Sequence, residues 1–384
     1  MSPKYVLALM VLLVASGFVL FDQRDARAGE VTPTPRFKVL DPIRHGNLTV
    51  FPVVAAKTYP TSEFLTLDEG LRSGEVVVTE AGSVQGLIRR HNRPIPHYDR
   101  AEVNRLVLVN NSSRPLLLLA GEVVSGGKQD RVIAKDRIIP AESDPVDLGV
   151  FCVEPGRWVA ESDRFGASEA MYGGAKGGPS SARMSTPMAL MVQPSVRAKA
   201  MGDKNQQEVW DAVTAQKQEM MVEVQASAPS VRTEMAQTSS YAKLNENQEV
   251  KKRVDAMAKP LEQNYQSLIR QLRDRNAVGV VVAVNGRIIW ADIFASTDLL
   301  AKYWPKLVRS YASEAVVTRA KEMEADISKA EAFLVDMEGR RETIESEPGV
   351  YRQREVSGDG FKAFALTSLL PKTGFEVHIA KMAE

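Results

Sequence analysis

Short runs of β-branched and apolar residues dominate the first half of the chain and predict strands. These runs lie at 48–54, 75–79, 105–109, 115–119, 131–139 and 146–153. Such runs at short spacing favour a mainly antiparallel sheet. We expect 105–109 and 115–119 to form a hairpin. We also expect a helix within 62–71, capped by Thr66 or Ser62.

The second half of the chain alternates between helical and strand patterns. Apolar residues at steps of three and four predict a helix over 247–275, preceded by another that Asp203 or Asn205 would cap. The segments 278–284 and 287–294 flank Asn285-Gly286. This dipeptide is typical of a tight hairpin turn, because both of its residues accept positive φ. A helix capped by Asp298 follows, and then a charged helical stretch to about Gly339.

These patterns together predict an α+β protein: a mainly antiparallel sheet packed against helices, with a small C-terminal β appendage. We expect a main domain over 37–315. The Gly/Ser-rich segment 164–200 within it predicts a mobile loop. Residues 316–384 would form the charged helix and the C-terminal strands.

The N-terminal segment has the pattern of a secretory signal peptide. Lys4 precedes 17 uncharged residues, 5–21, and Ala26-Arg27-Ala28 offers small side chains at the cleavage positions. We therefore expect residues 1–28 to be removed, residues 29–36 to be a tether, and the protein to lie outside the cytoplasm, in the periplasm or secreted. No membrane span would then remain. The alternative is an uncleaved N-terminal helix that anchors the chain.

Charge and cysteine content exclude some classes of function. The chain has 49 basic and 48 acidic residues, and loss of residues 1–28 leaves 46 of each. A balanced charge argues against nucleic-acid binding. Cys152 is the only cysteine, so no internal disulfide can form and the core must hold the fold.

Polar and glycine residues gather in two segments that flank predicted strands, Gly121–Arg131 and Cys152–Trp158. Glycines there let the backbone turn sharply, so the two segments could meet at one end of a sheet. Carboxylates could act as acid and base, whereas cations and an amide could hold an anionic group. The catalytic candidates are Glu122 and Glu154, and the ligand-binding candidates are Lys128, Gln129, Arg131 and Arg157.

The same residues have a structural interpretation, in which Glu122–Arg131 and Glu154–Arg157 are ion pairs that fix the loops. Cys152, with apolar neighbours, is expected to be a buried apolar residue and not a nucleophile. His91 and His97 lie among arginines that oppose a divalent cation, so we expect neither a metal nor another cofactor. The loop also lacks the spacing of a nucleotide-binding phosphate loop.

The combination Gly-Glu, Gly-Gly-Lys-Gln-x-Arg and Cys-Val-Glu-x-Gly-Arg-Trp resembles a bacterial family of unknown function, the ADP-ribosylglycohydrolase- and rhodanese-phosphatase-superfamily-associated protein domain. The run 278–311 is also similar, so the resemblance covers about 37–315. Asp130 and Pro155 depart from the family pattern. The resemblance implies a context of ADP-ribose and phosphate chemistry, but no activity.

Three hypotheses follow for the function. The first is an extracytoplasmic binding or interaction module, whose partner is a small anionic ligand or an envelope protein. The second is an enzyme that acts on a phosphorylated or ADP-ribosylated group. The third is a structural protein of the envelope. They differ in whether Glu122 and Glu154 face one accessible site or are closed by ion pairs.

Overall fold

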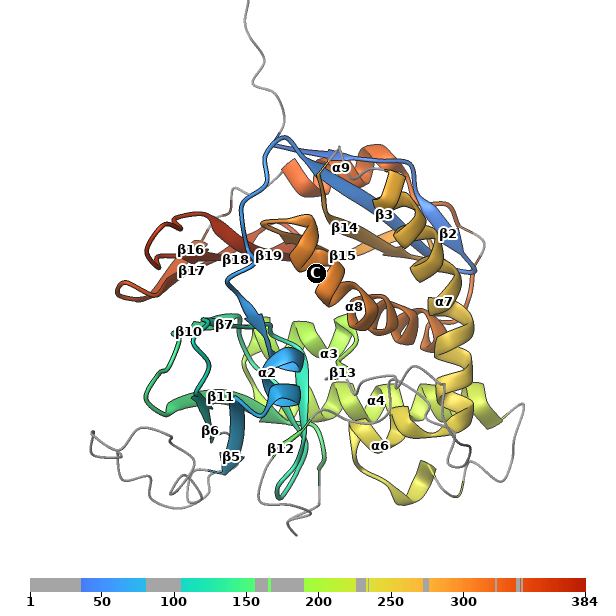
Figure 1. Ribbon diagram of the computed structural model, residues 1–384. Coiled ribbons are helices and arrows are strands. Elements are labelled where there is room, and N and C mark those ends of the chain that lie inside the picture. Colours follow the sequence, from blue (N-terminus) through green and yellow to red (C-terminus); the bar gives the residue numbers. More distant parts are fainter. Residues whose placement is uncertain are drawn as a thin grey trace, which may run out of the picture. The chain divides into compact units, whose positions relative to one another are not determined.

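Figure 1 shows the helices and strands of the computed structural model. The structure describes residues 36–80, 105–155, 165–166, 190–225, 233, 235–271, 276–321, 323–335, 339 and 341–384. The segment expected to be a signal peptide and tether lies almost wholly outside these residues, as do Arg157, His91, His97 and most of the Gly/Ser-rich segment. Within the described ranges, no helix is both long and apolar enough to cross a membrane.

Nine strands of the described chain form a central sheet in which every pairing is antiparallel. Its order is β1 (Phe37–Val39), β3 (Leu48–Ala55), β14 (Ala277–Val284), β15 (Arg287–Phe294), β19 (Glu376–Ala383), β18 (Phe361–Ser368), β17 (Tyr351–Gly358) and β16 (Arg341–Glu347), and β2 (Ile43–His45) pairs with β3.

Helices cover both faces of the central sheet (Figure 1). On one face, α7 (Gln248–Gln271) and α8 (Thr297–Val317) pack their apolar residues into the largest hydrophobic cluster, which includes Trp304 and Tyr265. On the other face, α9 (Ile327–Val335) covers a smaller cluster. Burial on both faces explains why β14, with the sequence Ala-Val-Gly-Val-Val-Val-Ala-Val, is apolar along its whole length.

Local sequence signals set the ends of several elements. The predicted hairpin 278–294 is confirmed, with Asn285 and Gly286 at φ of 50° and 74° between β14 and β15. Thr66 caps α2 (Leu67–Ser73) in a capping box with Glu69. Ser296, and not Asp298 as expected, caps α8, because its hydroxyl accepts the hydrogen bond of the Leu299 amide. A cap must precede the first turn, and Asp298 already lies inside it.

A second sheet closes on itself and forms what we call the small barrel. Because β12 pairs with both β5 and β8, six described strands make a closed ring whose inner side chains form one hydrophobic cluster. Around the ring run β5 (Val76–Glu80), β6 (Arg105–Asn110), β11 (Val146–Cys152), β9 (Arg131–Ile133), β8 (Glu122–Gly126) and β12 (Phe165–Gly166), and β13 (Leu190–Met191) pairs with β8.

The expected hairpin between 105–109 and 115–119 is wrong. β6 pairs with β5 and β11, whereas β7 (Leu116–Leu118) pairs with β10 (Arg137–Ile139) and β4 (Leu65–Thr66) in a separate sheet. The Asn110 side chain donates hydrogen bonds to the carbonyls of Arg114 and Pro140 and so fixes the connection between β6 and β7. Apolar alternation indicates a strand but does not choose its partner.

Helices also cover the outer face of the small barrel. They are α3 (Pro194–Ala198), a π-helical turn (Lys199–Asp203), α4 (Gln206–Gln225) and α6 (Tyr241–Glu246). Their apolar residues pack against Val123, Val132 and Phe151. Asn205 accepts hydrogen bonds from the first amides of α4, so of the two expected caps Asn205 is the one used.

The α+β class and the mainly antiparallel pairing are confirmed, but the C-terminal strands are not an appendage. β19 lies between β15 and β18 in the middle of the central sheet. Residues 376–383 therefore complete the sheet that β3 and β14 begin. The sequence could not indicate this, because the pairing of β15 with β19 joins segments more than 80 residues apart.

Candidate functional site

One end of the small barrel brings together parts of the two polar segments, the turn after β8 and the residues that follow β11. β5 ends there at Glu80 and β11 ends there at Cys152, which lies opposite Arg131. The turn that joins β8 to β9, residues 127–130, lies at the same end, because Val124 pairs with Arg131. We call this region the turn end of the barrel.

Glycine makes the tight turn between β8 and β9 possible. Gly126 and Gly127 have φ of 124° and 50°, in the region that favours glycine. A Cβ atom on Gly127 would lie 2.2 Å from a ring carbon of Phe165 and 3.0 Å from Glu80 Oε1. The same Glu80 Oε1 accepts the Lys128 amide at 3.2 Å. The turn therefore packs directly on the last residue of β5.

Glu154 fastens the segment after β11 to this turn. Its Oε2 atom accepts the Asp130 amide at 3.0 Å, and its carbonyl accepts Gln129 Nε2 at 3.2 Å. The Val153 amide donates to the Asp130 carbonyl at 3.0 Å. Glu154 and Gln129 are both buried. The structure thus places Gln129, Arg131 and Glu154 together, with half-buried Lys128 beside them.

Arg131 adds a buried positive charge at the turn end, with 1% of its surface exposed. Its Nη1 donates to the Asp130 carbonyl at 3.4 Å. Burial raises the pKa of the nearby Cys152 thiol, and the hydrogen bond from the Glu154 amide and the charge of Arg131 oppose this only in part. Cys152 is therefore a buried thiol and not an activated nucleophile.

Three acceptor atoms at or beside the turn are buried without a hydrogen-bond partner in the described part of the chain. They are Glu80 Oε2, Ser125 Oγ and Gln129 Oε1. Buried polar atoms in folded proteins nearly always have a partner, because an unpaired one costs about 1–3 kcal/mol. Their concentration around one turn indicates a place where a bound molecule could donate hydrogen bonds.

Glu122 lies at the opposite end of the β8–β9 ladder and is closed in an ion-pair cluster. Its Oε1 and Asp68 Oδ2 each lie 2.5 Å from Lys306 Nζ, and its Oε2 accepts the Leu119 amide at 2.8 Å. Burial by itself would lower the pKa of Lys306, but the charges of Asp68 and Glu122 outweigh burial and raise this pKa. For Glu122, burial outweighs the charge of Lys306, so the pKa of Glu122 is raised. Glu122 therefore shares no site with Glu154.

A second buried cluster surrounds His378, a residue outside the two polar segments. Its Nδ1 lies 2.6 Å from Asp136 Oδ2 and its Nε2 lies 3.1 Å from Asp292 Oδ1. Asp292 Oδ2 also accepts Arg197 Nη1 at 2.8 Å and the Tyr311 hydroxyl. A signal was present, since Asp292 and His378 are charged residues within otherwise apolar strands.

The charges of the His378 cluster balance one another. Burial alone would lower the pKa of His378, but Asp136 and Asp292 outweigh it and raise the pKa to about 9. Burial raises the pKa of Asp292, yet Arg197 and His378 bring it well below its usual range. At neutral pH two cations therefore face two carboxylates, and at most 1% of any of these residues is exposed.

The segment Leu119–Glu122 joins the two buried clusters. The Ala120 amide donates to Asp136 Oδ1 at 2.8 Å, and the Ala120 carbonyl accepts Arg197 Nε at 2.8 Å. Gly121 has a φ of 95°, and a Cβ there would lie 2.9 Å from a carbon of Arg197. These clusters hold the central sheet, α3, α8 and the small barrel together, which is a structural role.

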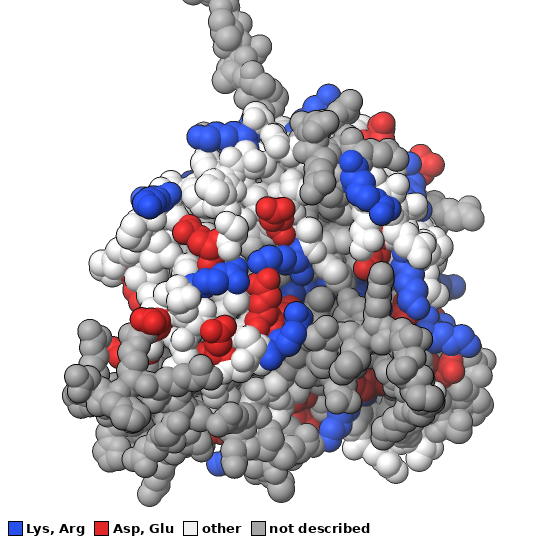
Figure 2. Space-filling view, viewed as in Figure 1, with Lys and Arg blue, Asp and Glu red and all other residues white. Residues whose placement is uncertain are grey.

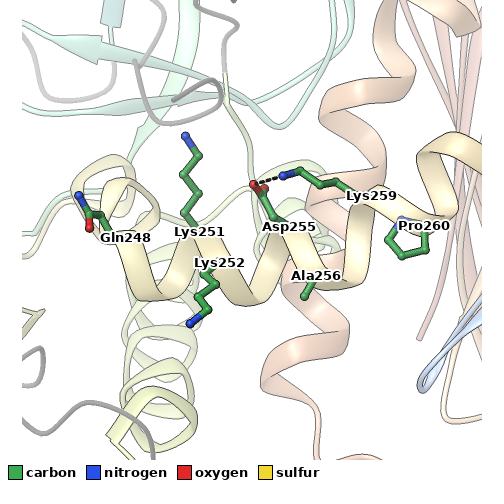
Figure 3. A pocket seen from close by; sticks show the side chains of 7 residues that line it. All are labelled: Gln248, Lys251, Lys252, Asp255, Ala256, Lys259 and Pro260. Carbon is green, nitrogen blue, oxygen red and sulfur yellow. Dashed lines mark ion pairs between the residues drawn. The ribbon is translucent and has the colours of Figure 1, made fainter. Parts of the chain in front are cut away.

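Cavities elsewhere in the described chain are lined by other residues. A groove of about 550 Å³ follows one face of α7 and is lined by Lys251, Lys252, Lys259 and Asp255, among others (Figure 3). Asp255 is already paired with Lys259 at 3.3 Å and with Arg309. A second cavity, of about 200 Å³, lies beside Tyr59 and Phe294. Neither cavity is lined by a residue of the two polar segments.

Metal ligation has no support in the part of the chain that the structure describes. Groups of three or more His, Cys, Asp or Glu side chains placed to hold an ion are absent among those residues. His378 has both ring nitrogens engaged by carboxylates. Arg157, in the second of the two polar segments, lies outside the described residues.

Comparisons with known proteins place the chain in a family but give no relative of known activity. Neither the curated proteins nor the solved structures that were compared include a match. A family model matches residues 36–381, which includes the C-terminal strands of the central sheet and extends beyond the segment that showed the resemblance. The chain therefore belongs to the family described as the ARG and Rhodanese-Phosphatase-superfamily-associated Protein domain.

Proposed function

We propose that this protein is an exported binding module whose ligand lies at the turn end of the small barrel. The observation that carries the proposal is the group of buried acceptors, Glu80 Oε2, Ser125 Oγ and Gln129 Oε1, gathered at or beside one turn. Lys128 and Arg131 supply positive charge at the same place. The extracytoplasmic location rests on the signal-peptide pattern of residues 1–28.

The chemistry of this end favours a ligand with hydroxyl groups and one anionic group. Carboxylate and amide oxygens that lack a donor are satisfied by hydroxyl hydrogens, whereas Lys and Arg pair with phosphate. A phosphorylated sugar combines both features. The description of the family, which mentions a phosphatase superfamily, is consistent with a ligand of this class.

Binding is favoured over catalysis by the state of the candidate acids. Glu122 is held by Lys306 and lies away from the turn, and Glu154 has one carboxylate oxygen engaged by the Asp130 amide. Burial raises the pKa of Cys152, so a thiolate is not available. A general acid or base exchanges a proton with the reacting group, and each glutamate already uses a carboxylate oxygen to accept a backbone amide.

Thermal-shift measurements and calorimetry with ribose 5-phosphate, ADP-ribose, ribose and inorganic phosphate test the proposal. We expect the two phosphorylated sugars to raise the melting temperature and the two fragments to do so much less. A ligand at 100 times its Kd stabilises the folded state by about 2.7 kcal/mol. If none of the four compounds binds, the structural interpretation of the buried polar residues replaces this proposal.

Two single-residue variants test whether the ligand binds at the turn end of the barrel. Glu80→Gln keeps the shape of the side chain but places a donor where the ligand is expected to donate, so the ligand-induced shift should be lost. Glu122→Gln is the matched control, because it alters the distant cluster with Lys306 and Asp68. It should lower the melting temperature while the ligand-induced shift remains. A ligand-induced rise in melting temperature that persists in Glu80→Gln would contradict binding at the turn end.

A further inference from the structure

The strand β16 ends the central sheet on an exposed edge. It pairs with β17 through seven residue pairs, from Arg341–Ser357 to Glu347–Tyr351, and no other described strand pairs with it. Six of its seven residues are exposed, and Ile344 is 56% exposed. In Figure 1 the β16–β17 hairpin lies at the left of the view, at the margin of the central sheet. An edge of this length presents backbone groups that another strand can pair with.

The order of charges along β16 complements itself in the antiparallel direction. The strand reads Arg-Glu-Thr-Ile-Glu-Ser-Glu, with Ile344 at its centre. If two copies pair about Ile344, each Arg341 lies opposite Glu347 of the other copy, and the two isoleucines face each other. Glu342 then lies opposite Ser346, and Glu345 opposite Thr343. Opposite charges across strands stabilise a pair, and here no like charges are opposed.

Neighbouring registers are less favourable for the same reason. A shift by one residue in either direction places Glu342 opposite Glu345 or opposite Glu347. A parallel arrangement in register places every glutamate opposite its own copy. Like charges directly opposite each other destabilise strand pairs. Pairing about Ile344 is therefore the arrangement that uses all seven residues and opposes no like charges.

Ion pairs within the chain hold β16 in place before any association. Arg137 Nη2 lies 3.3 Å from Glu347 Oε2, and Lys135 contacts Glu345. Lys135 lies in the connection after β9, and Arg137 lies on β10 in the three-stranded sheet. The glutamates keep 39% and 56% of their side-chain surface exposed, so Glu347 remains accessible to a second arginine. An ordered edge loses less conformational entropy when it pairs.

We propose that β16 pairs in antiparallel fashion with β16 of a second copy of this chain, which joins two central sheets across a two-fold axis. The same surface on both copies makes the interface self-complementary, as a two-fold dimer requires. Seven residues a side bury less area than a standard interface, so we expect a weak dimer whose population depends on concentration. Its formation does not depend on the ligand site.

Analytical ultracentrifugation of the full chain over a range from about one to several hundred micromolar tests this proposal. Wild type should pass from monomer to dimer. Arg341→Glu and Glu347→Arg should each remain monomeric, because each places like charges opposite one another twice. An equimolar mixture of these two variants should recover the dimer, since every opposed pair is then of opposite sign.

Two further variants, one at the proposed two-fold axis and one away from β16, separate loss of pairing from loss of folding. Ile344→Lys alters an exposed residue at the two-fold axis, so it should fold normally and abolish the dimer. Glu331→Arg on α9 is an exposed charge reversal away from β16 and should dimerise like wild type. A wild type that stays monomeric, a dimer that persists in Ile344→Lys, or a mixture that does not associate would overturn the proposal. A strand-donating partner of another kind would give the first of these results.

Discussion

The two ends of the β8–β9 ladder are equally buried but differ in how their polar groups are satisfied. At one end, Glu122 shares Lys306 with Asp68, and its second oxygen accepts a backbone amide. At the other end, Glu80, Ser125 and Gln129 each retain a buried acceptor atom without a partner in the described chain. The first arrangement stabilises the fold, whereas the second lowers stability unless another molecule contributes donors.

Figure 2 shows a related contrast on the surface. Acidic and basic side chains are interspersed over the face in view, in agreement with a net charge of +1. Long-range attraction therefore does not select a ligand, and specificity would come from a few buried groups. Four changes, from the largest expected effect to the smallest, test this comparison and the His378 cluster that adjoins the Glu122 end.

The largest effect is expected for Lys306→Met. This change removes the cation that lies between Asp68 and Glu122 and leaves two buried carboxylates facing each other. Breaking a buried pair in this way costs about 3–5 kcal/mol. Urea denaturation should show the loss in the free energy of unfolding. The triple variant Asp68→Asn, Glu122→Gln, Lys306→Met should recover part of it, because no uncompensated charge remains.

Alkaline pH should weaken the His378 cluster. The pKa of His378 is about 9 in the folded protein and near 6.5 when unfolded, so its contribution to stability is complete below about pH 6.5 and is lost as the pH rises through 9. The contribution is on the order of 3 kcal/mol. The free energy of unfolding, measured between pH 6 and pH 10, should fall more steeply for wild type than for His378→Gln. Parallel curves would contradict the assignment.

Gly127→Ala should cost about 2 kcal/mol or more, because a Cβ there meets the Phe165 ring as well as a left-handed backbone. Gly74→Ala is the matched control. Gly74 has a φ of 71°, but nothing lies within 4 Å of its Cβ position, so only the backbone term of about 1 kcal/mol applies. Equal losses in thermal unfolding would show that the turn relaxes without cost.

The smallest effect is expected for Ser125→Ala. It removes a buried hydroxyl oxygen that has no partner within the described residues, so stability should be unchanged or higher by up to about 1 kcal/mol. The ligand-induced thermal shift should decrease at the same time. A clear loss of stability without ligand would mean that the hydroxyl has a structural partner, and the comparison between the two ends would fail.

The sequence predicted what depends on neighbours along the chain. The Asn285-Gly286 turn, the Thr66 cap and the long apolar faces of α7 and α8 follow from local rules and are present. Pairing between distant strands did not follow, because apolar alternation is the same for any partner. Both the expected 105–119 hairpin and the expected C-terminal appendage were wrong for this reason.

The candidate site was predicted only in part. Spacing and glycines correctly brought Gln129, Arg131 and Glu154 together, and the pairing of β9 with β11 explains why. Glu122 was misplaced, because its partner Lys306 lies 184 residues away on α8 and no local pattern links them. Glu80 was missed, although it ends a run of valines, where a lone carboxylate indicates a special environment.

The position of β19 sets the order in which the central sheet can be completed during synthesis. β15 and β18 both border β19, so neither has its second neighbour until residues 376–383 have left the ribosome. His378 arrives with the same strand, so Asp136 lacks this partner until then, whereas Asp292 can already pair with Arg197. A nascent chain therefore cannot complete the central sheet until β19 has been synthesised.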